Sequence, residues 1–344
     1  MEDKIKDHLD KLEGKYDMMG QDTSAYLEGL LLCNYMPYWD YVNLDTLLTL
    51  QKPRTDYPDE TIFIIYHQIT ELYFRLCLHE YEQVSKNGKI ILDNGQDKGW
   101  KEKIEKPFLI NRLQRINAYF EALTKSYDVM RLGMDREQFL KFRMALLPAS
   151  GFQSAQYRKI EISSTDLKNL VHIDNRDKFK DYGDSEEEIR EIFEQIYWKA
   201  GATDTSTGEK TLTLRQVETK YTEEFIALAM EYRNGNLWQK YKQLSEEDQK
   251  DPALIGAMRM LDANVNINWP LVHYKTAARY LQKDTADEDT GATGGTNWQK
   301  YLPPRFMKRI FFPELWSEEE KAEWGKSWVD AQVTDGMEGS DSRH

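Results

Sequence analysis

Apolar residues recur every three or four positions along much of the chain, and strand-like alternation of apolar and polar residues is scarce. This spacing places apolar side chains on one face of an α-helix. We therefore predict an all-α protein. The longest helical stretches are predicted at 62–85, 108–130, 152–171, 185–200, 212–243 and 253–282.

The segments between these stretches are polar, and only 10 of the 344 residues are proline. Long periodic segments joined by polar connections are typical of an antiparallel helical bundle. No internal repeat with the period of a solenoid is visible. We predict one large helical domain at 23–330, preceded by a polar arm at 1–22 and followed by a polar, disordered tail at 331–344.

Acidic residues outnumber basic ones by 59 to 46, which gives a net charge of -13. A chain of this charge binds phosphate backbones and anionic bilayers poorly, so we expect neither nucleic acid nor membrane as a partner. The charged N-terminus lacks the apolar core of a signal peptide, and no apolar run is long enough to span a bilayer. We expect a cytoplasmic protein in which Cys33 and Cys77 are reduced and packed.

Motif spacing disfavours several reaction chemistries. The triplet GKS at 325–327 resembles the end of a phosphate-binding loop, but Glu320 stands where that loop requires glycine. The Glu-x-x-His and His-Glu-x-x-His patterns of helical metal centres are absent. The Gly-x-Ser-x-Gly and Gly-x-Gly-x-x-Gly turns are absent too, which weakens hydrolase and dinucleotide-binding interpretations. Histidine is the remaining candidate chemistry.

Two of the six histidines lie on largely apolar helical faces. The six are His8, His67, His79, His172, His273 and His344. The first and last lie in polar ends, His79 is near a predicted helix end and His172 is in a polar loop, whereas His67 and His273 occupy the apolar faces. Taken singly, each of these two is more commonly a hydrogen-bonded core residue than a ligand. Together they raise the possibility of haem, because neutral imidazole is a common axial ligand.

Several segments together resemble the tryptophan 2,3-dioxygenase family. The most specific is SGFQSAQYR at 150–158, which matches the family's SGFQS-x-Q-[YF]-R signature. The others follow in family order and cover most of the chain. They are YWDYVNLDTLL at 38–48, FIIYHQITEL at 63–72, the flanks of the signature within 142–161, ATGGTNWQKYL at 292–302 and FFPELW at 311–316.

The resemblance implies an all-α fold that encloses haem b, ferrous in the active form, and assembles as a homotetramer, a dimer of dimers. It implies that L-tryptophan and O2 are the substrates, and that cleavage of the indole C2–C3 bond gives N-formylkynurenine. The family's W-x(3)-H-x(5)-R element at 269–279 implies His273 as the proximal iron ligand. His67 would lie on the distal side and accept or exchange the indole N–H proton.

The resemblance also implies a set of substrate contacts. These are Phe63 against the indole, Phe139 beside it, Arg143 at the carboxylate, Thr293 at the amino-acid end, and Tyr38, Tyr41 and Val42 from the neighbouring subunit. Ser150 belongs to the substrate and cofactor pocket, with Gly151 beside it. Ser150 and Gln153 also form a capping box, so the hydroxyl can start a helix at 151–170 while the N–H groups face a haem propionate. Both roles stay open.

Four departures from the family pattern bear on substrate fit and on the loop at 284–297. Trp39 replaces a small residue, Val42 replaces leucine, 270–272 replaces basic and aromatic residues before His273, and the spacing from His273 to Thr293 is six residues longer. Three alternatives stay open. They are a haem enzyme of the same fold that mono-oxygenates a tryptophan derivative, a non-catalytic haem-binding sensor, and a helical interaction protein without a cofactor.

Overall fold

The structure is a computed structural model that describes residues 2–86, 104–183, 185–203, 208–281 and 307–325. Contacts divide the chain into two units, 1–52 and 53–344. All regular elements of the described residues are helices, and extended backbone pairs only in isolated bridges. The predicted all-α class is confirmed.

Unit 1, residues 1–52, is a string of helices with no buried side chain in any of them. They are α1 (Glu2–Asp17), α2 (Thr23–Leu32), α3 (Tyr38–Tyr41) and α4 (Leu44–Leu47). The helix α1 occupies most of the predicted arm at 1–22. Leu31 in α2 is 87% exposed and Tyr35 after it is 89% exposed. Exposed apolar area of this kind is typical of a surface that contacts another protein surface.

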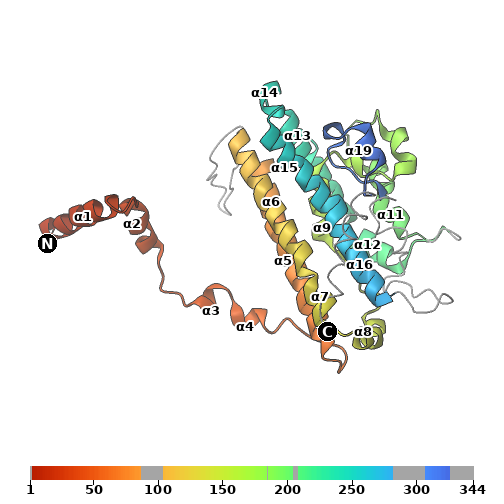
Figure 1. Cartoon of the computed structure of the whole chain (residues 1–344), viewed down its shortest axis with the longest axis horizontal. Helices are drawn as coiled ribbons and strands as arrows, with labels where there is room; N and C mark the ends of the chain where they lie inside the picture. Colours follow the sequence, from red (N-terminus) through yellow and green to blue (C-terminus); the bar gives the residue numbers. More distant parts are fainter. Residues whose placement is uncertain (1, 87–103, 184, 204–207, 282–306, 326–344) are drawn as a thin grey trace, which may run out of the picture. The chain divides into compact units, whose positions relative to one another are not determined.

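Unit 2 contains the long helices and the hydrophobic core. Its α-helices are α5 (Asp59–Ser85), α6 (Lys106–Ser126), α7 (Asp128–Gly133), α8 (Arg136–Phe142), α9 (Ala155–Ser164), α10 (Glu186–Glu194), α11 (Tyr197–Gly201), α12 (Leu212–Tyr232), α13 (Leu237–Lys242), α14 (Glu246–Gln249), α15 (Pro252–Ala263), α16 (Trp269–Leu281) and α19 (Glu318–Ala322). In Figure 1, α5 and α6 run along the length of this unit, and α15 and α16 follow one another beside α6. The helix α5 contacts α6 and α9, and α6 contacts α15.

The core of unit 2 follows the predicted three- and four-residue spacing. On α6, the fully buried residues are Leu109, Leu113, Ile116, Phe120 and Leu123. The same spacing on α5 buries Phe74, Cys77 and Tyr81. Cys77 is therefore packed as expected, but Cys33 in unit 1 is exposed and the expectation of packing is wrong there.

The predicted helix at 151–170 is broken on both sides of α9. Ser150 and Gln153 do form a capping box, but it starts only the 3-10 turn η2 (Gly151–Gln153). Ser154 then caps α9 by accepting a hydrogen bond from the backbone of Tyr157. At the other end the Ser164 hydroxyl donates to the carbonyl of Ile160 at 2.7 Å. Hydroxyl side chains that bond to nearby backbone favour helix ends over helix interiors, which explains both breaks.

A π-helical turn, η5 (Asn264–Asn268), joins α15 directly to α16. The N–H of Trp269 bonds to the carbonyl of Asn264, five residues back. The carbonyl of Val265 is next in this ladder, but Pro270 has no N–H to offer it. Instead it accepts hydrogen bonds from Tyr157 Oη and Arg309 Nη2, both at 3.1 Å. Pro270 therefore lies in the first turn of α16, inside a helical run that continues directly from α15 through the π turn.

A buried carboxylate fixes the segment 307–325 to α15. Asp262 is 0% exposed and accepts hydrogen bonds from the backbone N–H groups of Phe311 at 3.0 Å and Phe312 at 3.1 Å. The indole N–H of Trp316 donates to the same carboxylate at 3.0 Å. Burial raises the pKa of Asp262 to about 6, and these donors act against that rise. The segment thus reaches the same helical run that carries His273.

Candidate active site

A cavity of about 340 Å³ lies among α5, α8, α9, the π turn and α16. Its size falls in the range of small-molecule and cofactor sites. Both histidines on apolar helical faces, His67 and His273, line it. Eleven of its 29 lining residues are aromatic, and they are Phe63, Tyr66, Phe74, Tyr127, Phe139, Phe152, Tyr157, Tyr197, Trp198, Trp269 and Tyr280.

The helix α5 places Phe63 and His67 one turn apart on the cavity wall. Their ring centroids are 4.1 Å apart. His67 Nδ1 lies 2.7 Å from the carbonyl oxygen of Phe63. Because a carbonyl can only accept, Nδ1 carries the proton and Nε2 is left as an acceptor when the ring is neutral. Burial lowers the pKa of His67, while the bond to Phe63 and the charge of Glu71 act against this, so the neutral form is favoured.

The helix α16 places His273 on the same cavity. Its ring stacks on Tyr127, with centroids 5.9 Å apart and planes 25° from parallel, and Trp269 lies one turn earlier at 6.4 Å. Burial, together with the neighbouring His67, lowers the pKa of His273 to about 4. The imidazole is therefore neutral at pH 7, which is the form that binds a metal ion.

Aromatic rings from three helices meet beside His67. Phe139 on α8 lies 6.1 Å from Phe63 and 5.1 Å from Tyr280 on α16, measured between ring centroids. Phe142, at the end of α8, lies 5.9 Å from Phe63. This part of the wall suits a flat aromatic ligand, because tilted and edge-to-face contacts are the favoured geometries for such rings.

The structure brings most of the predicted site residues of unit 2 together. The predicted residues that line the cavity are Phe63, His67, Phe139, Ser150, Gly151 and His273. Arg143 does not line it, but is only 5% exposed in the turn η1 (Arg143–Leu146) that follows α8. Burial lowers the pKa of the Arg143 guanidinium.

Four predicted residues lie elsewhere. Thr293 lies outside the described residues. Tyr38, Tyr41 and Val42 belong to unit 1, where Tyr38 is 69% and Tyr41 76% exposed.

A buried charged cluster on the cavity wall was not predicted. Glu161 bonds to both Arg158 and Arg309, and Tyr157 and Tyr197 bond to Arg309 through their hydroxyls. Arg158 belongs to the SGFQSAQYR segment, so the motif could have indicated it. Arg309 is separated from Glu161 by 148 positions in the sequence, and no local pattern connects them.

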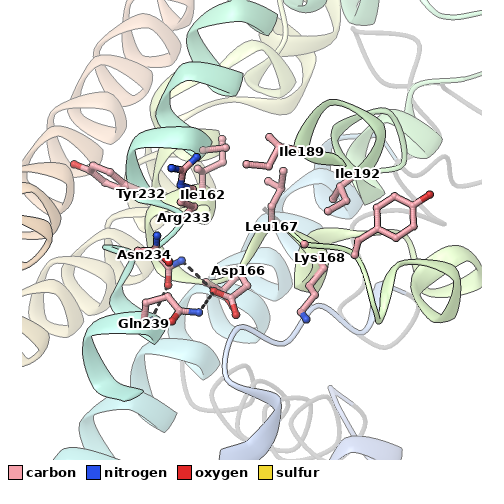
Figure 2. Close-up of a pocket in the computed structure, with 15 residues that line it drawn as sticks. Ile162, Asp166, Leu167, Lys168, Ile189, Ile192, Tyr232, Arg233, Asn234 and Gln239 are labelled. Atoms are coloured by element: carbon pink, nitrogen blue, oxygen red, sulfur yellow. Dashed lines mark hydrogen bonds between the residues drawn. The ribbon is translucent and has the colours of Figure 1, made fainter. Parts of the chain in front are cut away.

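A second cavity, of about 240 Å³, lies between the turn η3 (Leu167–Leu170), α10 and the junction of α12 with α13 (Figure 2). Asp166 at its edge accepts hydrogen bonds from Asn236 at 3.1 Å and Gln239 at 2.7 Å, and pairs with Lys242 at 3.3 Å. No histidine lines this cavity. The carboxylate of Asp166 is occupied by side chains at the start of α13 and so serves to hold the fold together. We therefore take the first cavity, which His67 and His273 line, as the candidate active site.

The described residues contain neither a membrane-spanning helix nor a cluster of metal-binding side chains. None of their helices combines the length and apolar character needed to cross a bilayer. None of their His, Cys, Asp and Glu side chains gather in threes or more as a metal-binding cluster.

Comparison with known proteins identifies the family of this chain. A sequence profile described as tryptophan 2,3-dioxygenase matches residues 33–247, more than half of the chain. The chain belongs to the tryptophan 2,3-dioxygenase family. His67, Arg143 and Ser150 lie within the matched residues, whereas His273 lies beyond them. The position of His273 in this family's site is therefore supported by the cavity geometry and not by the profile.

Individual relatives carry the same name. A tryptophan 2,3-dioxygenase from Ruegeria sp. is 40% identical over 126 residues, which are 37% of this chain and 40% of that protein. One from Bradyrhizobium diazoefficiens is 28% identical over 288 residues, 82% of this chain and 91% of that protein. One from Alteromonas mediterranea is 32% identical over 219 residues, 62% of this chain and 54% of that protein.

The low pKa of His273 predicts a pH dependence of stability. The folded pKa of about 4 lies below the ordinary value of 6.5, so the unfolded chain binds the proton first as pH falls. Stability is therefore lost as pH falls from about 6.5 toward 4, by roughly 1–3 kcal/mol from this residue. Urea unfolding of the wild type and His273→Gln across this range should show a smaller loss in the variant. Equal losses would contradict a buried, neutral His273.

Proposed function

We propose that this chain is a haem-dependent dioxygenase that cleaves the indole C2–C3 bond of L-tryptophan with O2 and yields N-formylkynurenine. The observation that carries the proposal is the pair of neutral imidazoles, His67 and His273, on one aromatic cavity. Membership of the family, whose relatives are named tryptophan 2,3-dioxygenase, supports the same reaction.

The residues present fit haem b. His273 offers a neutral imidazole, a common axial ligand of haem iron, and Tyr127 and Trp269 hold its ring in place. The aromatic wall suits a large flat macrocycle. Ser150 and Gly151 line the cavity and would lie near a propionate or the substrate. When bound, ferrous haem supplies the iron that activates dioxygen.

The chain's own residues would orient the substrate. His67 Nε2, left as an acceptor by the bond from Nδ1 to Phe63, would accept the indole N–H. Phe63 and Phe139 would flank the indole ring and keep water away from it. Arg143, buried next to the aromatic end of α8, would bind the substrate carboxylate, with Thr293 at the amino-acid end.

Unit 1 supports self-association. Its helices bury no side chain, and large apolar residues such as Leu31 and Tyr41 are 87% and 76% exposed. We propose that Tyr38, Tyr41 and Val42 complete the pocket of a neighbouring subunit in a homotetramer, because apolar area on this scale is normally covered by a partner. Light scattering on the purified protein should give four times the chain mass of 40.6 kDa. A mass of one chain would contradict this assembly.

Product analysis tests the reaction. Purified protein reconstituted with haem, reduced, and given L-tryptophan and O2 should form a product heavier by two oxygen atoms, with the absorption spectrum of N-formylkynurenine. A product with one added oxygen would support the mono-oxygenase alternative and contradict ring cleavage. Haem binding with no spectral response to L-tryptophan would support the sensor.

Replacing His273 with Ala should abolish stable haem binding and leave the helical fold intact, because the ligand is lost while its helix gains a strong helix former. A Soret titration of the purified variant measures the first effect, and far-ultraviolet circular dichroism measures the second. The exposed His79→Ala is the matched control and should bind haem as the wild type does. An unchanged Soret band in His273→Ala would mean that another residue holds the iron.

Replacing His67 with Ala should leave haem binding intact and lower kcat/KM for L-tryptophan about tenfold to a hundredfold, because the indole N–H loses its buried acceptor. The same variant should lose little on 1-methyl-L-tryptophan, which has no N–H to donate. Steady-state rates with both substrates measure the difference. Equal losses on the two substrates would show that His67 acts through packing alone.

A further inference from the structure

Arg158 is a buried arginine whose hydrogen bonds to other side chains are made by one of its three nitrogen atoms, Nη1. It projects from α9, is 8% exposed, and lines the candidate active site. Its Nη1 donates to Glu161 Oε2 at 3.1 Å and to Tyr197 Oη at 3.0 Å. Its Nε is buried and has no hydrogen-bond partner among the described residues. An unpaired buried donor is costly. The Nε atoms of Arg112 and Arg176 are likewise buried without such a partner, but Arg158 also lines the candidate active site.

The guanidinium is held in an aromatic cage. Its central carbon lies 5.1 Å from the ring centre of Trp198, 5.4 Å from that of Phe152 and 5.5 Å from that of Tyr157. Rings on several sides restrict the side chain and exclude water from it. With Nη1 engaged, Nε and Nη2 form the remaining edge. Two parallel N–H groups on one edge of a guanidinium match the two oxygens of a carboxylate.

The charge around this edge favours an anion. Glu161 is 1% exposed and is shared by Arg158 and Arg309, which is 6% exposed. Glu161 is the carboxylate that both guanidinium groups contact directly, whereas the buried Asp262 reaches Arg309 only through Asn266 and is engaged with the backbone of Phe311 and Phe312. The acidic residue that lines the cavity, Glu71, accepts a hydrogen bond from Gln156 at 2.8 Å. Arg158 thus shares its direct acidic partner with Arg309, and an anion at its open edge would complete its pairing.

We infer that the Nε–Nη2 edge of Arg158 is a carboxylate-binding subsite inside the candidate active site. Two ligands of the cavity can supply that carboxylate, a haem propionate or the carboxylate of the amino-acid substrate. This inference rests on the proposed function for the identity of these ligands. The alternative is that Arg158 only fastens α9 to Tyr197 and the segment 307–325.

The first test titrates the haem-free protein with haemin and with haemin dimethyl ester, in which both propionates are capped. If Arg158 binds a propionate, the wild type prefers haemin by about tenfold to a hundredfold. Arg158→Lys keeps the charge and can still bond to Glu161, but it lacks the two-donor edge. It should lose most of this preference and bind the ester as the wild type does.

The second test compares L-tryptophan with tryptamine, which lacks the carboxylate, by calorimetry on haem-free and haem-loaded protein. If Arg158 shares the amino-acid carboxylate with Arg143, Arg158→Lys loses part of the preference for L-tryptophan and keeps the preference for haemin. Arg112→Lys is the matched control. Arg112 is half-buried, lies outside the cavity and donates to Glu80 at 2.8 Å. It should leave both preferences unchanged.

The outcomes separate the subsite from the proposed function. Loss of either preference in Arg158→Lys alone supports the subsite. The subsite is overturned if Arg158→Lys keeps both the preference for haemin and the preference for L-tryptophan. It is also overturned if the wild type shows neither preference, and this outcome does not depend on the folding of a variant. Wild-type protein that discriminates the carboxylate ligands but forms no N-formylkynurenine would refute the proposed reaction while leaving the subsite in place.

Discussion

The carbonyl of Val265 is the point on which the candidate active site depends. Pro270 leaves it without its backbone donor, and in a buried helix such an acceptor must be satisfied by a side chain. Tyr157 from α9 and Arg309 from the segment 307–325 supply the two donors. One missing N–H thus ties two distant parts of the sequence to the start of the helix that carries His273. The π turn is therefore part of the construction of the site.

Burial sets the chemistry of the two histidines. In water an imidazole exchanges its proton near neutral pH, but enclosure among aromatic rings disfavours the charged form of both His67 and His273. The local hydrogen bonds then distinguish them. The carbonyl of Phe63 fixes the proton of His67 on Nδ1, whereas the ring of His273 is positioned by stacking on Tyr127. Neutral His67 can therefore accept a hydrogen bond through Nε2, and neutral His273 has a ring lone pair that is able to bind a metal ion.

The helical class and the core were predictable because they depend on local periodicity. The spacing on α6 from Leu109 to Leu123 needs no knowledge of its neighbours. The histidines were predictable for the same reason, since each is an exception on an apolar face. The family motif then linked them to Phe63 and Phe139, which the structure places on the same cavity.

The parts that sequence reasoning missed depend on contacts between distant residues. The bond from Arg309 to Glu161 joins residues that are 148 positions apart in the sequence. In the sequence Asp262 resembles any polar residue of a helix, and its role is visible only in the structure, where the N–H groups of Phe311 and Phe312 donate to it. The break before α9 was missed because both Ser150 and Ser154 are good N-cap residues, and a capping box does not say how long its helix is. The apolar pattern of α2 likewise does not say which surface covers it.

The docking of the segment 307–325 determines how the acidic partner of Arg158 is shared. Without Arg309, Glu161 would pair with Arg158 alone. Asp262 holds Phe311 and Phe312 by their backbone N–H groups, and this places Arg309, two residues before Phe311, against Glu161. Arg158 therefore shares Glu161 with a second guanidinium only when this segment is docked. A carboxylate bound at Arg158 would in turn stabilise the docked segment, because a ligand stabilises the conformation that binds it.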